Sequence, residues 1–282
     1  MYKYRFEFRI VRMAKVLRVS ESGYYKWLSR KGAAPTEKEL SDQLLSAEIH
    51  ELFRQSRGSY GSRKITALLN RNRKDPVNHK RVERLMQEHK LFSRTSKKYI
   101  ATTDSSHGDP VAENLIQRDF EADEPNKKMV SDTTAIKTDQ GVLFVAGILD
   151  LCGRMPVGLG MSIHNDRYLV MEALDDMLTR GCGKPGCILH SDRGATYASE
   201  DYRRMLRDNG LICSMSRKGD CWDNAPMESF WGKMKDEWLK GKYRSIEEAA
   251  RDVYEYFWYF YPCIRPHETY RYQTPQEVYS KG

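Results

Sequence analysis

The sequence predicts an α/β domain preceded by a small, basic, all-α region. From residue 127 on, segments of strand-like and helix-like apolar spacing alternate along the chain. Two runs, residues 142–149 and 187–189, are almost continuously apolar, which is typical of central strands covered on both faces. Before residue 100, apolar residues recur instead at the three- and four-residue steps of amphipathic helices.

Residues 1–35 form the first predicted segment, a helix-turn-helix-like pair. The stretch 12–28 indicates a short helix, a turn and a second helix, with Ser20 placed to cap the second helix. A small helical hairpin that packs only its own aromatic residues explains the same pattern equally well. The segment therefore predicts two helices and leaves their role open.

Residues 36–100 predict a basic region of three helices, the first from Glu37 to Arg54 and the third beginning near Asn78. The apolar positions that define the three helices are Leu45, Ile49, Leu52, Phe53, Ile65, Leu68, Leu69, Val82, Leu85 and Met86. Lys80, Arg81 and Arg84 fall on other faces of the third helix, where they could contact DNA in a major groove. The alternative is a helical bundle whose charges face only water.

Charge is unevenly distributed along the chain. Residues 1–100 contain 24 Lys and Arg against 10 Asp and Glu, whereas the remainder contains 23 basic and 29 acidic residues. Neutralisation of phosphates supplies most non-specific affinity for DNA, so a basic region ahead of an acidic one suits a protein that acts on DNA. A basic surface that is merely solvated is the alternative.

The predicted α/β domain covers residues 127–240. We interpret residues 101–126, which lose periodicity and mix Ser, Thr, Asp, Gly and Pro, as a linker. The strand candidates are 128–137, 142–150, 155–163, 187–192 and 211–216. The helix candidates are 166–180, 199–209 and 223–240, with Asp223 as the expected N-cap of the last one and Met227, Phe230, Trp231, Met234 and Trp238 as its buried face.

Three acidic residues of this domain are candidate metal ligands. Asp132 lies within the first predicted strand, Asp192 at the end of a buried strand, and Glu228 on the last predicted helix. Hard divalent cations such as Mg²⁺ prefer carboxylate oxygens, and phosphoryl transfer on nucleic acids typically uses two ions side by side. Three converging carboxylates are enough to hold two Mg²⁺ or Mn²⁺ ions.

The sequences around these acids resemble those of a known family. The strings are KKMVSDTTAI, CILHSDRGATY and SMSRKGDCWDNAPMESFWGKMKDE. Together with RGSYGSRKI, NHKRVERLMQE and the closing RPHETYRYQTPQEV, they resemble the transposases of bacterial insertion sequences of the insertion sequence 3 family. Two positions depart from the family pattern, since Met129 and Pro262 stand where Trp and Asn are usual.

The resemblance implies both a fold and an activity. The expected fold is the ribonuclease-H-like catalytic core of the retroviral-integrase superfamily, with Asp132, Asp192 and Glu228 as its metal-binding acids. The expected activity is metal-dependent cleavage at the 3′ ends of the element's inverted repeats, followed by strand transfer. The resemblance also points to Lys235, two helical turns after Glu228, as a contact to a phosphate or a terminal base. A solvated lysine is the alternative at that position.

Several other polar residues near the acids have weaker assignments. Arg193 and Asn224 are candidate secondary contacts to DNA. His190 fits a hydrogen-bonded core histidine better than a substrate contact. Asp139 and Asp150 sit at strand ends, where turns favour Asp for local reasons, and we assign them turn or capping roles.

Residues 241–282 form an aromatic and basic C-terminal extension. The run VYEYFWYFYPCIRPHETYRY fits an amphipathic helix that closes the core, although aromatic rings can also stack on unpaired bases. Arg265, His267 and Arg271 are the residues of this run that we expect to be most exposed.

The expected partners are the double-stranded ends of the element and target DNA. Two ends in one complex require at least a dimer, and the family often adds an upstream-frame DNA-binding protein, separately or as a fusion. No apolar run reaches the ~20 residues that span a bilayer, so we expect a cytoplasmic protein without membrane contact. The alternative functions are a catalytically inactive, sequence-specific DNA-binding regulator and a structure-specific nuclease that cuts without rejoining.

Overall fold

The computed structural model describes residues 1–31, 33–93, 112–217, 221–239 and 241–282. The chain forms two compact units, Met1–Glu48 and Ile49–Gly282. The predicted linker falls partly on residues 101–111, which lie outside the described residues. Its remaining part, residues 112–126, contains no helix or strand.

The first unit contains two short helices and the beginning of a third. They are α1 (Ile10–Leu17), α2 (Glu21–Lys31) and α3 (Glu37–Gln55), preceded by the short 3₁₀ turn η1 (Tyr2–Tyr4). Ser20 caps α2 as predicted, since its Oγ accepts a hydrogen bond from the Gly23 N–H at 3.0 Å. The α3 start is a reciprocal cap, because Thr36 and Glu39 each accept from the other's backbone N–H.

The predicted second and third helices of the basic region are confirmed. They are α4 (Ser62–Asn70) and α5 (His79–Glu88), which pack against each other. Asn78 begins α5, as expected, by accepting a hydrogen bond from the Lys80 N–H at 2.8 Å. The predicted inward residues Ile65, Val82 and Leu85 are buried.

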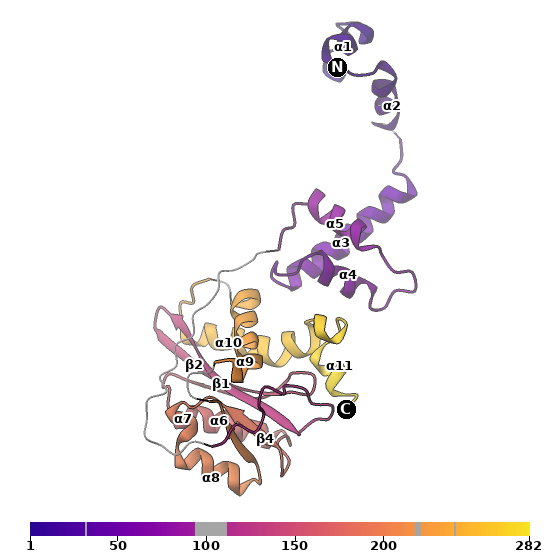
Figure 1. Cartoon of the computed structure of the whole chain (residues 1–282). Coiled ribbons are helices and arrows are strands. Elements are labelled where there is room, and N and C mark those ends of the chain that lie inside the picture. The colour runs from indigo at the N-terminus through magenta and orange to yellow at the C-terminus, as the bar shows by residue number, and fades with distance from the viewer. Residues whose placement is uncertain (32, 94–111, 218–220, 240) are drawn as a thin grey trace. The chain divides into compact units, whose positions relative to one another are not determined.

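A five-stranded mixed sheet organises the second unit (Figure 1). Its strands are β1 (Lys128–Thr138), β2 (Gly141–Asp150), β3 (Met155–Ser162), β4 (Ile188–Ser191) and β5 (Ile212–Met215), in the order β3-β2-β1-β4-β5. The first three pair antiparallel, while β4 and β5 join parallel to β1. All five strands were predicted, each with bounds within about two residues of those observed.

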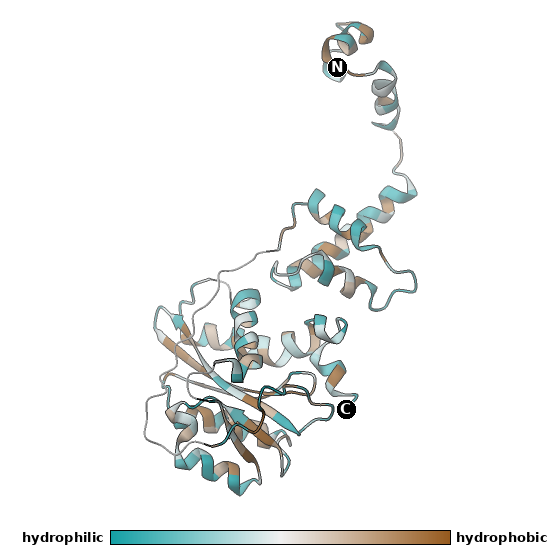
Figure 2. Cartoon of the chain, viewed as in Figure 1, coloured by the Kyte–Doolittle hydropathy of each residue, from teal (hydrophilic) through white to brown (hydrophobic). Residues whose placement is uncertain are grey.

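One face of the sheet is covered by α6 (Arg167–Thr179), α7 (Ala195–Ala198) and α8 (Glu200–Asp208). Two glycines of β3 allow α6 to approach closely. A Cβ on Gly158 would lie 2.3 Å from the Ala173 carbonyl oxygen, and one on Gly160 would lie 2.5 Å from that of Leu169. Figure 2 shows the hydrophobic residues gathered in the strands, whereas α8 is largely hydrophilic. The short α7 was missed by the sequence prediction.

The other face is covered by α9 (Ala225–Lys233) and by a C-terminal helical segment. A Cβ on Gly147 of β2 would lie 2.8 Å from the Trp231 ring and 3.1 Å from the Phe257 ring, so both rings rest on this face. The predicted helix 223–240 is divided into η2 (Cys221–Asn224), α9 and the π-helical turn η3 (Met234–Trp238). Its five predicted inward residues are all buried.

The C-terminal run is a helix that closes the core, as favoured from the sequence. It consists of α10 (Ile246–Glu255) continuing into the π-helical η4 (Tyr256–Ile264), followed by η5 (Glu268–Tyr270) and α11 (Pro275–Tyr279). The exposure expected for Arg265 and His267 is wrong, because they are only 4% and 3% exposed. Arg265 is drawn inward by Glu237, with which it forms a two-point ion pair at 2.6 and 2.8 Å. Arg271 is exposed as expected.

No helix among the described residues is both long and apolar enough to cross a lipid bilayer.

Candidate active site

The register of the sheet brings Asp132 and Asp192 onto neighbouring strands. Strands β1 and β4 pair in parallel, with Val130 opposite His190. Continuing that register by two residues places Asp132 alongside Asp192, which directly follows β4. Because residues two apart share a face of the sheet, the two side chains point the same way. Asp132 is also paired with Gly147 of β2, so it faces the layer that contains α9.

Electrostatics shows that the three acids are near one another. Burial raises the pKa of Asp132 well above its usual value, and the charges of Asp192 and Glu228 raise it further. A hydrogen bond from the Thr133 backbone and the charge of Lys235 oppose this rise. Like charges disfavour ionisation only within electrostatic range, so Asp192 and Glu228 lie in the neighbourhood of Asp132, whereas burial alone raises the pKa of Glu228.

Hydrogen bonds fix the backbone around Asp192 and at the start of the helix that carries Glu228. Asp192 accepts a hydrogen bond from the Gly194 N–H at 2.8 Å, which closes the turn between β4 and α7. Glu228 is exposed on the first turn of α9. Asn224, just before α9, donates from its side chain to the Ser131 carbonyl oxygen at 3.0 Å and ties that helix to β1 beside Asp132.

Lys235 reaches the same face of β1. Its ammonium donates to the Thr134 hydroxyl at 2.5 Å, and Thr134 is two residues on from Asp132. Burial lowers the pKa of Lys235, while the charge of Asp132 opposes that change. The lysine therefore lies beside the acids rather than in open solvent.

The donor set fits a hard divalent cation. Carboxylate oxygens are the ligands that Mg²⁺ and Mn²⁺ prefer, and a cation would offset the repulsion that raises the pKa of Asp132. Among the described residues, no three His, Cys, Asp or Glu side chains stand in an arrangement that could hold an ion. The acids are thus close enough to interact but are not gathered around one point.

The remaining predicted DNA contacts lie in two places. Arg193 follows Asp192 directly and donates from its Nε to the Ser216 carbonyl oxygen. Lys80, Arg81 and Arg84 lie on α5, a different element from those that carry the acids. Lys80 is exposed, Arg81 is half-buried, and Arg84 pairs with Glu88 at 2.7 Å. Asn224 is buried, at 5% exposure, so its observed role is to position α9.

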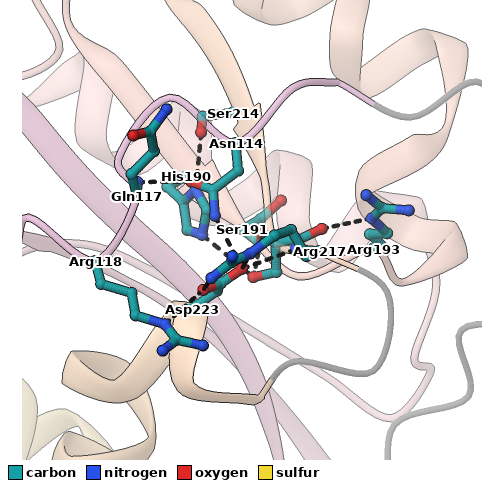
Figure 3. Close-up of polar contacts among 10 residues, drawn as sticks. Asn114, Gln117, Arg118, His190, Ser191, Arg193, Ser214, Arg217 and Asp223 are labelled. Carbon is teal, nitrogen blue, oxygen red and sulfur yellow. Dashed lines mark hydrogen bonds and ion pairs between the residues drawn. The ribbon is translucent and has the colours of Figure 1, made fainter.

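His190 is a hydrogen-bonded core residue, as predicted. It is completely buried, with Nδ1 2.8 Å from the Ser214 hydroxyl and Nε2 3.2 Å from that of Ser216 (Figure 3). These contacts fix β4 against β5 immediately before Asp192. The turn role predicted for Asp150 is also confirmed, since its carboxylate accepts from the backbone N–H groups of Asn126 and Cys152.

His190 gives a pH dependence of stability. Burial lowers its pKa from 6.5 to about 4, so between these values the unfolded chain binds more protons and stability falls as pH decreases. We expect the free energy of unfolding of the wild type, measured in denaturant, to be lower at pH 4.5 than at pH 7. Roughly 2–3 kcal/mol of that difference should come from His190. His190→Asn should reduce the loss, whereas the same change at the exposed His164 should leave it intact. Equal losses in both variants would contradict the assignment.

Sequence reasoning misjudged Asp223. It does not cap α9, because the helix follows Asn224 and has no side-chain cap. Instead its fully buried carboxylate accepts hydrogen bonds from Arg217, Arg118 and Asn114 (Figure 3). The bonds from Arg217 hold the pKa of Asp223 far below its usual value. Arg118 is distant in sequence, so only Arg217, six residues before Asp223, stands near enough in the sequence to suggest a partner for it.

The order of the strands places the part of the second unit that contains the sheet in the class of integrase core domains. Family models agree: an HTH-like domain matches residues 39–99, and integrase core domain models match residues 122–221 and 209–275. These matches also confirm the predicted fold class, an integrase core preceded by a helix-turn-helix-like region.

Relatives identify the family more narrowly. The chain is 34% identical over 281 residues to the transposase InsF for insertion sequence IS3A of Escherichia coli K12, covering 99% of this chain and 97% of that protein. It is 38% identical over 256 residues to an uncharacterized 31 kDa protein of insertion element IS600 from Shigella sonnei, covering 90% and 93%. The chain therefore belongs to the transposases of the insertion sequence 3 family.

Among solved structures, the chain is similar to the HTLV-2 integrase catalytic core domain in complex with magnesium. The similarity has a TM-score of 0.42 and 11% identity, and it covers 55% of this chain and 97% of that one.

Proposed function

We propose that this transposase cleaves DNA at the 3′ ends of its element and joins them to new DNA with the aid of divalent cations. Asp132, Asp192 and Glu228 would hold these cations, two Mg²⁺ or Mn²⁺ ions per site. The observation that carries the proposal is the register of β1 with β4, which sets Asp132 alongside Asp192 on the sheet face that α9, the helix of Glu228, covers. Clustered like charges are costly to fold, and a cation-binding role accounts for them.

Each residue of the site has a part in this chemistry. The bound cations would supply a more acidic water and offset charge on the reacting phosphate. Lys235, held beside β1 by Thr134, would offer its ammonium to a neighbouring phosphate. In the joining step, the freed 3′ hydroxyl attacks a phosphodiester, and one P–O bond forms as another breaks. The proton of the attacking hydroxyl leaves to water, and the departing oxygen takes a proton from water to become a new hydroxyl. Bond number is conserved, so the step needs no ATP.

DNA contacts outside the acids are proposed for the basic residues. Lys80, Arg81 and Arg84 on α5 would contact the duplex, and Arg193 would contact the strand near the acids. Because phosphate contacts release counterions, affinity should fall steeply with salt concentration. Two element ends in one complex would require at least a dimer, and an upstream-frame partner or fusion would add further DNA contacts.

A strand-transfer assay tests the proposal with labelled duplexes that carry the element's ends. We expect joined product from the wild type in Mg²⁺ or Mn²⁺, none in EDTA, and at least ~10³-fold less from Glu228→Gln, because several kcal/mol of charge stabilisation are lost. The matched control is Asp236→Asn, which changes an exposed acid eight residues further along and should keep activity. Binding without cutting would favour the regulator, and cutting without joining would favour the nuclease.

A further inference from the structure

Arg57 links the basic helical region to the helical segment that carries Glu228 and Lys235. It lies between α3 and α4, within the residues that match the HTH-like domain. Its guanidinium donates to both carboxylate oxygens of Asp252 on α10, at 2.8 and 2.9 Å. It also donates to the Trp238 carbonyl oxygen at 3.2 Å and lies over the Trp238 ring, 3.8 Å from its centre.

The bond to Trp238 caps the end of a helical segment. Trp238 is the last residue of η3, which directly continues α9. The last carbonyl groups of a helix have no donor within the helix, and they form the negative end of its dipole. A guanidinium at this place supplies both a donor and a positive charge. The Trp238 ring is buried, with its centre 4.2 Å from that of Phe260, so the capped end is anchored in the core.

The capped turn is the one that contains Lys235. Lys235 lies three residues before Trp238 in η3, and its ammonium bonds the Thr134 hydroxyl on β1. Glu228 lies at the other end of the same continuous segment, on the first turn of α9. A displacement of the Trp238 carbonyl therefore moves the turn from which Lys235 reaches β1.

The backbone at Arg57 indicates that its side chain has a specific role. Its φ is +51°, a left-handed conformation that glycine adopts at much lower cost. Local backbone preference therefore does not account for an arginine here. Docking of the loop on α10 needs only the ion pair with Asp252, whereas the contacts with the Trp238 carbonyl and ring act on η3.

We propose that Arg57 is a positioning residue, which fixes η3 so that Lys235 is held beside the acids during strand joining. The inference rests on the proposed function, in which Lys235 offers its ammonium to a phosphate. The basic helical region would then contribute to the rate of joining as well as to the binding of DNA.

Single-turnover joining at saturating DNA tests this role. Arg57→Gly removes the side chain and suits the left-handed backbone. We expect it to lower the joining rate roughly 10- to 100-fold and to leave the Kd for the element-end duplex within about twofold. Arg57→Lys should have an intermediate rate, because an ammonium keeps the charge without the planar fork. The matched control is Arg54→Ala, which removes an exposed arginine of α3 and should join at the wild-type rate.

A double-mutant cycle with Lys235→Ala separates positioning from a general effect on stability. If Arg57 acts through Lys235, adding Arg57→Gly to Lys235→Ala should slow joining by no more than about twofold. Equal slowing by Arg57→Gly in both backgrounds would overturn the proposal. A weakened Kd with an unchanged rate at saturating DNA would also overturn it, since Arg57 would then be a DNA contact.

Hydrogen exchange gives a readout that does not need activity. The Leu239 N–H bonds the Met234 carbonyl oxygen at 3.0 Å across the capped turn. Arg57→Gly should accelerate exchange of the amides from Met234 to Leu239 at least ~10-fold, and Arg54→Ala should not. Unchanged exchange would contradict the proposal. If the wild type joins no DNA but Arg57→Gly accelerates this exchange, the proposed function fails while the fixing of η3 by Arg57 stands.

Discussion

Replacing Asp132 with Asn is expected to abolish strand joining and at the same time to stabilise the protein. The activity loss should reach at least ~10³-fold, since one carboxylate of the proposed cation site disappears. The free energy of unfolding at pH 7 should rise by about 1–2 kcal/mol, because a half-buried negative charge beside Asp192 and Glu228 is removed. Asn still offers an oxygen to the Thr133 backbone, so the local hydrogen bond survives.

The stability gain should depend on pH in a defined direction. Because the folded-state pKa of Asp132 is raised above 3.8, the folded wild type binds more protons than the unfolded chain once pH exceeds that value. Wild-type stability therefore falls as pH rises through this window, and the advantage of Asp132→Asn should grow from near zero below about pH 4. Denaturant unfolding from pH 3.5 to 8 measures this difference.

Adding Mg²⁺ tests whether Asp132 belongs to a cation site or is only a buried carboxylate that destabilises the fold. A cation that binds only the folded protein stabilises it by about 2.7 kcal/mol at a hundred times its dissociation constant. We expect Mg²⁺ to raise the melting temperature of the wild type and to have little effect on Asp132→Asn. If Asp132→Asn keeps its strand-joining activity, or if Mg²⁺ raises its melting temperature as much as that of the wild type, Asp132 does not belong to the cation site.

The fold was largely predictable because its elements are locally encoded. Strands such as β2 are apolar runs between turn residues, and α4 and α5 have clear helical spacing, so the bounds of β2 and the presence of the two helices followed from short windows of sequence. Helix α7 was missed because Ala195–Ala198 is too short to show a period. The expected helix 223–240 was divided because tertiary contacts of Asp223 replaced the cap that local rules assign to it.

Candidate site residues were predictable in identity but not in every contact. The order of strands and the register of β1 with β4 account for the approach of Asp132 to Asp192, and this register cannot be derived from either segment alone. Arg265 and His267 were expected at the surface because isolated basic residues are usually exposed. The burial of Arg265 depends on Glu237, which is far from it in sequence, so no local pattern indicated it. His267 instead packs against the rings of Tyr261 and Tyr270.

Glu237→Gln is expected to cause the largest loss of stability, about 3–5 kcal/mol. Glu237 joins three parts of the second unit, since it accepts two hydrogen bonds from the buried Arg265 and one at 2.9 Å from Lys64 of α4. Burial would raise the pKa of Glu237, but the bonds and charges of Arg265 and Lys64 outweigh it and lower the pKa to about 2. Gln would leave the Arg265 charge without its counter-ion.

Denaturant unfolding of matched variants would distinguish this buried ion pair from an ordinary surface pair. Glu255→Gln removes an exposed partner of Arg57 and should change stability by no more than about 0.5 kcal/mol. Replacing both Glu237 and Arg265 with Met should cost far less than Glu237→Gln, because no unpaired charge remains at Arg265 and half-buried Lys64 can reach water.

Since the folded-state pKa of Glu237 is lowered, its contribution to the free energy of unfolding is complete above about pH 4.5 and should disappear as pH falls through 2. A cost below about 1 kcal/mol for Glu237→Gln at pH 7 would show that this cluster does not hold α4 to the core.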